Sequence, residues 1–144
     1  MVIITNQSGI SRGFFNWHDY EKITSRIIDL IGKKNPIIGI FANGLGPNSP
    51  VPGWRKPSPE MINYAANMLK IDLHNSFLIG DRLSDVEAGF NAGIRNLIHL
   101  ETGHGIKERE MVLKFKEKKS SPNPNQMYSY FFCKNLNFYR EFLK

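Results

Sequence analysis

Short apolar runs alternate along this chain with longer segments in which apolar residues recur every three or four positions. The continuous apolar runs predict four strands that are buried on both faces, at residues 2–5, 37–42, 76–80 and 96–100. The segments with helical spacing predict helices at about 17–33, from Ser58 to about Lys70, and from Ser84 to Gly93. Alternating strands and helices with short connections predict an α/β fold of three layers, in which helices cover both faces of a parallel sheet.

Polar residues at the ends of these segments indicate where the helices begin and end. Asn16 can cap the first helix, and Ser58-Pro59-Glu60 has the cap, the proline and the acidic residue of a helix start. Residues 84–87 have the spacing of a capping box, and Gly93 can end the helix that they begin.

The sequence changes character near residue 106. We expect a main domain over residues 1–106 and a C-terminal extension over 107–144, in which 107–119 are helical and 120–126 form a linker. The net charge is +6, and residues 107–144 carry +5 of it. Because the positive charge gathers in the extension, we expect a solvated tail rather than a nucleic-acid-binding face.

Composition narrows the class of protein further. Hydrophobic residues make up 41% of the chain, which is enough for a packed core and too many for a disordered segment. The single cysteine, Cys133, excludes an internal disulfide framework and a cysteine-rich zinc site. We find no secretory signal and no apolar run of the roughly 20 residues that a membrane span needs, so we expect a cytoplasmic protein with no membrane partner.

Candidate chemistry lies where the predicted strands end, because open parallel sheets bind ligands at the carboxyl ends of their strands. The first strand leads into Thr5-Asn6-Gln7-Ser8, whose hydroxyl and turn amides can hold a phosphate oxygen. The third strand leads into Asp81, with Asp85 four residues later, and this pair of carboxylates suits Mg²⁺. Lys56, beside Arg55, precedes a helix and can neutralise a phosphoryl group.

Each of these features alone has an ordinary structural reading. The segment after the first strand, taken alone, is typical of a turn, and the two aspartates alone are typical of helix caps. The Arg-Lys pair alone is typical of a solvated surface. Their occurrence together at successive strand ends favours the functional reading.

Three segments in this order resemble the histidinol-phosphatase and D,D-heptose 1,7-bisphosphate phosphatase family of the haloacid dehalogenase superfamily. The segments are TNQSGISRGFF, RKPSPEM and GDRLSDVEAGFNAGIRNLIHLETGHG, and the resemblance spans about residues 2–105. It implies a Rossmann-like fold and a phosphatase acting on a small phosphorylated sugar, heptose bisphosphate above all.

The resemblance also implies roles for individual residues. Thr5 and Lys56 would stabilise the phosphoryl group, and Asp81 would bind Mg²⁺ with support from Asp85. The residues implied to contact substrate are Asn6, Gln7, Ser8, Arg55 and Arg82.

Two departures from the family pattern matter. The family begins with a central strand ending in Asp-x-Asp, which supplies the nucleophile and the general acid and base, and these 144 residues contain no Asp-x-Asp. We therefore expect the chain alone to be inactive. Relatives also bind structural zinc in the loop before the Arg-Lys pair, but residues 43–54 contain no cysteine or histidine, so we predict no zinc.

A missing central strand would leave two unpaired edges, beside the strands that end at Thr5 and Gly80. Residues 127–132, MYSYFF, have strong β propensity and could fill this gap, although a helix packed on the main domain is the favoured interpretation of the tail.

Two other functions stay open. The TNQ and RKP segments also occur in polynucleotide 3′-phosphatases, and the chain could instead be a non-catalytic phospholigand-binding protein or a decayed remnant. The sequence does not fix the oligomeric state.

Overall fold

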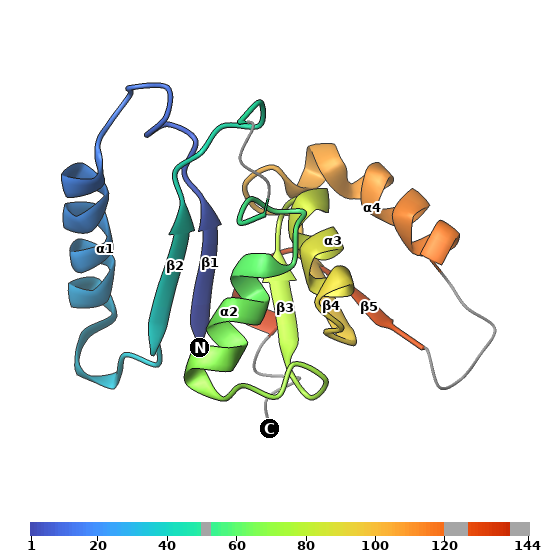
Figure 1. The fold of residues 1–144 in the computed structure, drawn as a ribbon. Coiled ribbons are helices and arrows are strands. Elements are labelled where there is room, and N and C mark those ends of the chain that lie inside the picture. The colour runs from blue at the N-terminus through green and yellow to red at the C-terminus, as the bar shows by residue number, and fades with distance from the viewer. Residues whose placement is uncertain (50–52, 120–126, 139–144) are drawn as a thin grey trace. The chain divides into compact units, whose positions relative to one another are not determined.

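The computed structural model describes residues 1–49, 53–119 and 127–138, and it divides the chain into two compact units (Figure 1). Unit 1 is Met1–Arg55 and unit 2 is Lys56–Lys144. Both units combine parallel strands with helices, so the predicted α/β class is confirmed. The boundary that we predicted at residue 106, between a main domain and a C-terminal extension, stays a prediction.

Unit 1 contains a two-stranded parallel sheet and one long helix. Strand β1 (Val2–Asn6) pairs with β2 (Gly39–Asn43), and helix α1 (Trp17–Ile31) with the 3-10 turn η1 (Gly32–Lys34) connects them. The predicted cap of α1 is confirmed, because the Asn16 side chain accepts a hydrogen bond from the Asp19 amide and the Asp19 side chain accepts one in return.

Unit 2 contains a three-stranded parallel sheet in the order β3-β4-β5. Its strands are β3 (Phe77–Gly80), β4 (Asn96–Leu100) and β5 (Ser129–Cys133), and its helices are α2 (Glu60–Leu69), α3 (Leu83–Asn91), α4 (Gly105–Lys119) and the 3-10 turn η3 (Leu136–Phe138). The largest fully buried side chains in this unit are those of Met61, Leu97, Ile98, His99, Val86 and Val112. Strand β4 is therefore the centre of the core, with a neighbour on each side.

The N-terminus of α3 differs from the prediction. The helix begins at Leu83, and the N3 residue of its cap is Asp85, whose side chain accepts from the Arg82 amide. Ser84 and Glu87 thus lie inside the helix and form no capping box. The C-terminus follows the prediction, because Gly93 has a φ of 82° and its amide donates to the Phe90 carbonyl.

The aromatic tail segment is a strand, so the favoured helical reading was wrong for residues 129–133. Strand β5 pairs in parallel with β4, with Leu97 opposite Tyr130 and Leu100 opposite Cys133. It does not fill a gap beside β3, because β4 lies between β3 and β5. The expected vacancy beside β1 and β3 stays a prediction. The predicted linker, residues 120–126, lies outside the described residues.

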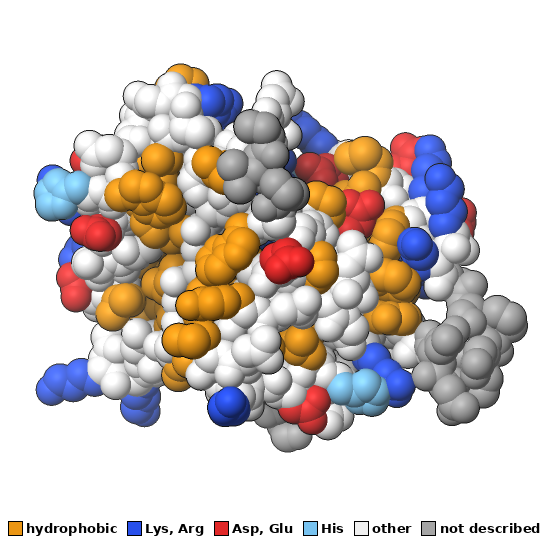
Figure 2. Space-filling model, viewed as in Figure 1, with side chains coloured by type: hydrophobic (Ala, Val, Ile, Leu, Met, Phe, Trp, Pro, Cys, Tyr) orange, Lys and Arg blue, Asp and Glu red, His pale blue; other side chains and the backbone are white. Residues whose placement is uncertain are grey.

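Helix α4 carries much of the charge that the sequence places in the extension. Lys116, Lys118 and Lys119 occupy its last turn, and Figure 2 shows Lys and Arg side chains gathered over this helix. The charged helix predicted at 107–119 is therefore confirmed. In the described part of the chain, no helix has both the length and the apolar character that crossing a bilayer requires.

Candidate functional site

The polar turn that follows β1 belongs to unit 1. Gln7 Nε2 donates a hydrogen bond to Thr5 Oγ1 at 2.9 Å, and the Gln7 amide donates to the Asn43 carbonyl at 2.7 Å. Ser8 is held by Arg12, whose Nη2 donates to its hydroxyl at 3.3 Å. A hydroxyl that accepts a hydrogen bond can still donate one, so Thr5 can offer its hydrogen to a phosphate oxygen.

Arg55 also lies in unit 1, where its guanidinium donates to the Leu45 carbonyl at 3.1 Å. The boundary between the units falls between Arg55 and Lys56. The structure therefore groups the phosphate-binding candidates of the first strand with Arg55, and it groups Lys56 with the two aspartates. Convergence of both groups on one ligand stays a prediction.

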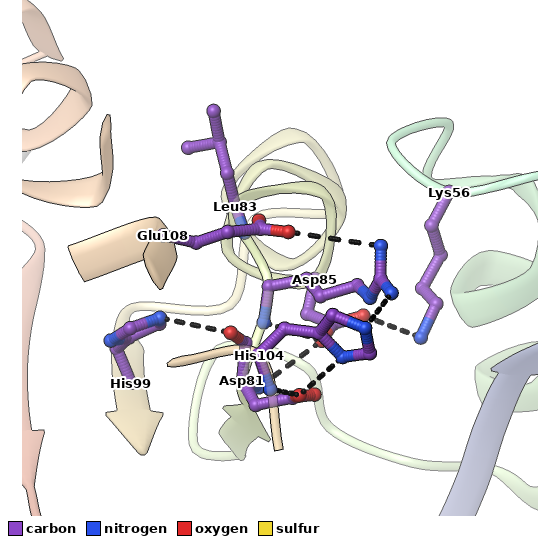
Figure 3. Close-up of polar contacts among 8 residues, drawn as sticks. Lys56, Asp81, Leu83, Asp85, His99, His104 and Glu108 are labelled. Atoms are coloured by element: carbon purple, nitrogen blue, oxygen red, sulfur yellow. Dashed lines mark hydrogen bonds and ion pairs between the residues drawn. The ribbon is translucent and has the colours of Figure 1, made fainter. Parts of the chain in front are cut away.

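The carboxylate of Asp85 makes three polar contacts within unit 2 (Figure 3). One oxygen, Oδ2, accepts from the amides of Asp81 at 3.3 Å and Arg82 at 3.1 Å, and the other lies 2.5 Å from Lys56 Nζ. The Lys56 and Asp85 side chains are only 12% and 10% exposed. Gly80 makes this arrangement possible, because a Cβ at that position would lie 2.4 Å from the Asp85 Cβ.

Asp81 follows β3 and faces the loop before α4. Its Oδ2 accepts a hydrogen bond from the His104 amide at 2.7 Å, and His104 Nδ1 lies 3.4 Å away. Burial opposes ionisation of Asp81, but the hydrogen bonds from the His104 backbone and ring outweigh it, so the pKa of Asp81 lies below its ordinary value. The carboxylate is thus held ionised, as a metal ligand must be.

Two carboxylates hold the first turn of α3. Besides Asp85, Glu108 of α4 accepts from the Leu83 amide at 2.7 Å, and its other oxygen lies 3.7 Å from Arg82 Nη1. Arg82 Nη2 in turn lies 2.6 Å from His104 Nε2. Negative charge at a helix N-terminus is stabilising. These contacts therefore fix the start of α3, and with it the short segment between β3 and α3 that contains Asp81.

The buried His99 and the partly buried Arg109 form a support for Asp81 that the sequence analysis did not identify. His99 is 1% exposed. Its Nδ1 accepts from Arg109 Nε at 3.0 Å, so its Nε2 carries the hydrogen and donates to the Asp81 carbonyl at 3.1 Å. Burial, followed by the positive charge of Arg109, lowers the pKa of His99 and keeps the ring neutral. The available signal was a histidine inside the apolar run NLIHL, which we predicted only to be a buried strand.

The donor set of unit 2 fits a lightly coordinated Mg²⁺ centred on Asp81. The described residues contain no group of three or more acidic, histidine or cysteine side chains suited to a metal ion. Mg²⁺ usually keeps several waters and needs only one or two carboxylates besides substrate phosphate. Asp81 meets this need. Asp85 already contacts Lys56 and accepts hydrogen bonds from two amides, so it is better suited to supporting the metal site than to binding the metal.

Comparison with known proteins gives consistent matches. Residues 53–123 match the model of the HAD-hydrolase-like family. The chain is 39% identical over 115 residues to D-glycero-alpha-D-manno-heptose-1,7-bisphosphate 7-phosphatase of Photorhabdus laumondii, covering 75% of this chain and 63% of that protein. It is 30% identical over 125 residues to D-glycero-beta-D-manno-heptose-1,7-bisphosphate 7-phosphatase of Haemophilus ducreyi, covering 78% of this chain and 69% of that protein.

A solved structure supports the same relationship. The crystal structure of D,D-heptose 1,7-bisphosphate phosphatase from B. bronchiseptica, complexed with magnesium and phosphate, matches with a TM-score of 0.79 and 26% identity. The match covers 99% of this chain and 72% of that one. Among the curated relatives, the chain spans 46% of the length of one and 69% of another.

Proposed function

We propose that this chain takes part in the hydrolysis of a phosphate ester on a small sugar. The chain belongs to the haloacid dehalogenase-like hydrolase family, in the group that includes the heptose bisphosphate phosphatases. The favoured substrate is D-glycero-D-manno-heptose 1,7-bisphosphate, which the names of the relatives specify. The observation that carries this proposal is the position of the Lys56–Asp85 pair beside Asp81. Lys56 is a cation that can bind a phosphoryl group, and Asp81 is a carboxylate that can bind a metal.

The residues of unit 2 would act by position and charge. Lys56 would neutralise a phosphoryl oxygen, and Asp85 would hold the lysine ammonium in place while capping α3. Asp81 would hold Mg²⁺, which when bound shields the phosphate charge and orients the phosphoryl group. Its backbone is fixed by His99 and its carboxylate by His104, so little reorganisation is needed when the ligand arrives. Arg82 would contact the substrate.

The residues of unit 1 would bind phosphate oxygens. The Thr5 hydroxyl and the turn formed by Asn6, Gln7 and Ser8 present donors at the carboxyl end of β1. Arg55 would add a second positive charge for a phosphorylated substrate.

The proposed reaction needs an attacking carboxylate as well. An aspartate would bond to phosphorus while the sugar oxygen leaves with a proton, and water would then release inorganic phosphate and regenerate the aspartate. These 144 residues contain no Asp-x-Asp to supply the nucleophile and the proton donor. We therefore expect turnover when a strand ending in Asp-x-Asp is joined before Met1, and none without it.

The test measures Mg²⁺-dependent phosphate release from heptose 1,7-bisphosphate by the chain with this strand joined to it. We expect release to fall to background in Asp81→Ala and by at least about 100-fold in Lys56→Met, since one preorganised charge is worth that much in a dry site. Lys107→Met, which removes an exposed lysine of α4, is the matched control and should retain full activity. Undiminished release by Asp81→Ala, or faster release from a DNA 3′-phosphate, would refute the proposal.

A further inference from the structure

A cavity of about 380 Å³ lies within unit 1, at the carboxyl end of β2. This volume is in the range of small-molecule sites. Its walls are largely apolar and include Ile10, Trp17, Asn43, Gly44, Leu45 and Trp54. Asn43 and Leu45 support the site described above through their backbone carbonyls, but none of these side chains has a role in the proposed chemistry, so the cavity needs an explanation of its own.

Asn43 contributes a buried polar group without a partner. The residue is 5% exposed, and its Nδ2 has no hydrogen-bond partner among the described residues. Its Oδ1 accepts from the Leu45 amide at 2.9 Å, which fixes the orientation of the side chain, because a flipped amide would set two donors against each other. A buried donor left unpaired is costly, so a ligand oxygen that accepts from Nδ2 would gain affinity.

Both tryptophans of the chain line this cavity. Trp17 is 47% exposed and Trp54 is 39% exposed, so ring surface remains accessible. Trp17 packs closely on Gly44, where an added Cβ would lie 2.8 Å from the indole. The face of an aromatic ring is negative and attracts the weakly positive C–H groups of a saturated ring. Two indoles with one amide donor therefore suit a ring that has an apolar C–H face and oxygen atoms at its edge.

The cavity is joined to the polar turn after β1. The Gln7 amide donates to the Asn43 carbonyl at 2.7 Å, and the Ser11 amide donates to the Gly44 carbonyl at 3.2 Å. Asn43, the last residue of β2, thus supports the turn that we assign to phosphate, and together with Gly44, which follows β2, it forms part of the wall of the cavity. A ligand with its phosphate on the turn would place the group attached to that phosphate near the cavity.

We propose that this cavity receives the sugar ring of the phosphorylated substrate and so selects which phosphate ester is bound. The inference rests on the proposed function, because it assigns the sugar of that substrate to the cavity. Trp17 and Trp54 pack against the C–H face of the ring, and Asn43 Nδ2 donates to one of its oxygens. The pairing of a donor with apolar walls favours a sugar over a purely hydrocarbon ligand, which would leave the amide unpaired.

The two tryptophans allow a direct test, since all indole emission of the chain comes from this cavity. Heptose 1,7-bisphosphate, the unphosphorylated heptose and inorganic phosphate are titrated separately into the 144-residue chain with Mg²⁺. Tryptophan emission reports occupancy of the cavity, and a thermal shift reports binding anywhere on the protein. We expect both sugars to change the tryptophan emission. Inorganic phosphate should raise the melting temperature but leave the emission unchanged.

Three variants sharpen the result. Asn43→Asp keeps the acceptor for the Leu45 amide but removes the donor, and it should weaken sugar binding about tenfold. Because a charge at this buried site can impair folding, Trp17→Ala and Trp17→Phe provide a second series at a half-exposed position, with Trp54 as the reporter. Alanine should weaken sugar binding more than phenylalanine, which keeps an aromatic face.

The outcomes separate this inference from the proposed function. Thermal protection by heptose bisphosphate with unchanged emission, and with equal affinity in all three variants, would refute the cavity assignment and leave the phosphatase proposal standing. A change in emission with the unphosphorylated heptose, but no phosphate release by the chain with the joined strand, would uphold a sugar site and refute the phosphatase. No response to either sugar, when the chain with the joined strand still releases phosphate from heptose bisphosphate, would refute the cavity assignment alone.

Discussion

Lys56 Nζ lies 2.5 Å from Asp85 Oδ1, and both side chains are nearly buried. The same carboxylate accepts two amide hydrogen bonds at the start of α3. Asp85 therefore links Lys56 to helix α3, which begins two residues after Asp81. The same contact thus contributes both to the candidate site and to the fold of unit 2.

The first prediction concerns the strength of this pair. A double-mutant cycle of Lys56→Met and Asp85→Asn, measured by urea unfolding, should give a coupling free energy of about 1–3 kcal/mol, because close buried charges interact strongly. The exposed pair Lys114–Glu110 on α4, at 2.7 Å, is the control and should show far weaker coupling, since water screens it. Equal coupling in the two cycles would contradict the role assigned to burial.

The second prediction concerns His99. Replacing it with leucine removes both the donor to the Asp81 carbonyl and the acceptor for Arg109 Nε. We expect the free energy of unfolding to fall by about 1–3 kcal/mol, because two partly buried polar groups lose their partners. Glutamine can both donate and accept, so His99→Gln should lose less.

Chemical denaturation of the two variants measures this difference, and magnesium provides a second readout. The leucine variant should also need more Mg²⁺ for the same thermal stabilisation, because its Asp81 backbone is no longer fixed. If His99→Leu and His99→Gln were equally stable and responded equally to Mg²⁺, the histidine would be a core filler without a positioning role.

Local signals account for what the sequence predicted correctly. The cap at Asn16, the turn at Gly93 and the runs that became β1 and β4 depend on residues close together in the chain. The spacing of Asp81 and Asp85 is equally local, because a strand end and the next helical turn fix it.

Long-range pairing accounts for most of what the sequence missed. Residues 129–133 have the composition of a strand, but composition cannot say that they pair with β4 rather than with β3. The Arg109–His99 contact joins α4 to β4, and the Glu108 contact joins α4 to the start of α3. The cap of α3 was misplaced because Ser84 and Asp85 both suit helix starts, and only the hydrogen bond to the Arg82 amide decides between them.

The third prediction concerns Gly93, which ends α3 with a φ of 82°. Gly93→Ala should lower the free energy of unfolding by about 1 kcal/mol, because an L-residue is strained in this conformation. A Cβ there would meet nothing within 4 Å, so any loss reports backbone strain rather than a clash. Gly93→Asn is the matched control and should lose less, since asparagine tolerates the left-handed region. Equal stability of the alanine variant and the parent chain, in urea unfolding, would contradict the helix end described here.

The fourth prediction concerns Tyr130 of β5. Its hydroxyl is buried and has no hydrogen-bond partner among the described residues, and burial raises the pKa of Tyr130 to about 12. Tyr130→Phe should therefore raise the free energy of unfolding at neutral pH, because it removes an unpaired polar group without changing the shape of the ring. Tyr128→Phe is the control, because the Tyr128 hydroxyl lies 3.5 Å from the Phe90 carbonyl and its loss should bring no gain.

The pH dependence of the Tyr130 effect has a definite sign. The unfolded chain releases the phenol proton near pH 10, whereas the folded chain retains it until about pH 12. The folded state of the parent chain thus loses stability as the pH rises from about 10 to about 12, and Tyr130→Phe lacks this loss. Urea unfolding of the two chains between pH 7 and pH 11 should show an advantage of the phenylalanine variant that is constant up to about pH 9 and grows above it. A constant difference across the whole range would mean that the Tyr130 hydroxyl is solvated in the folded protein.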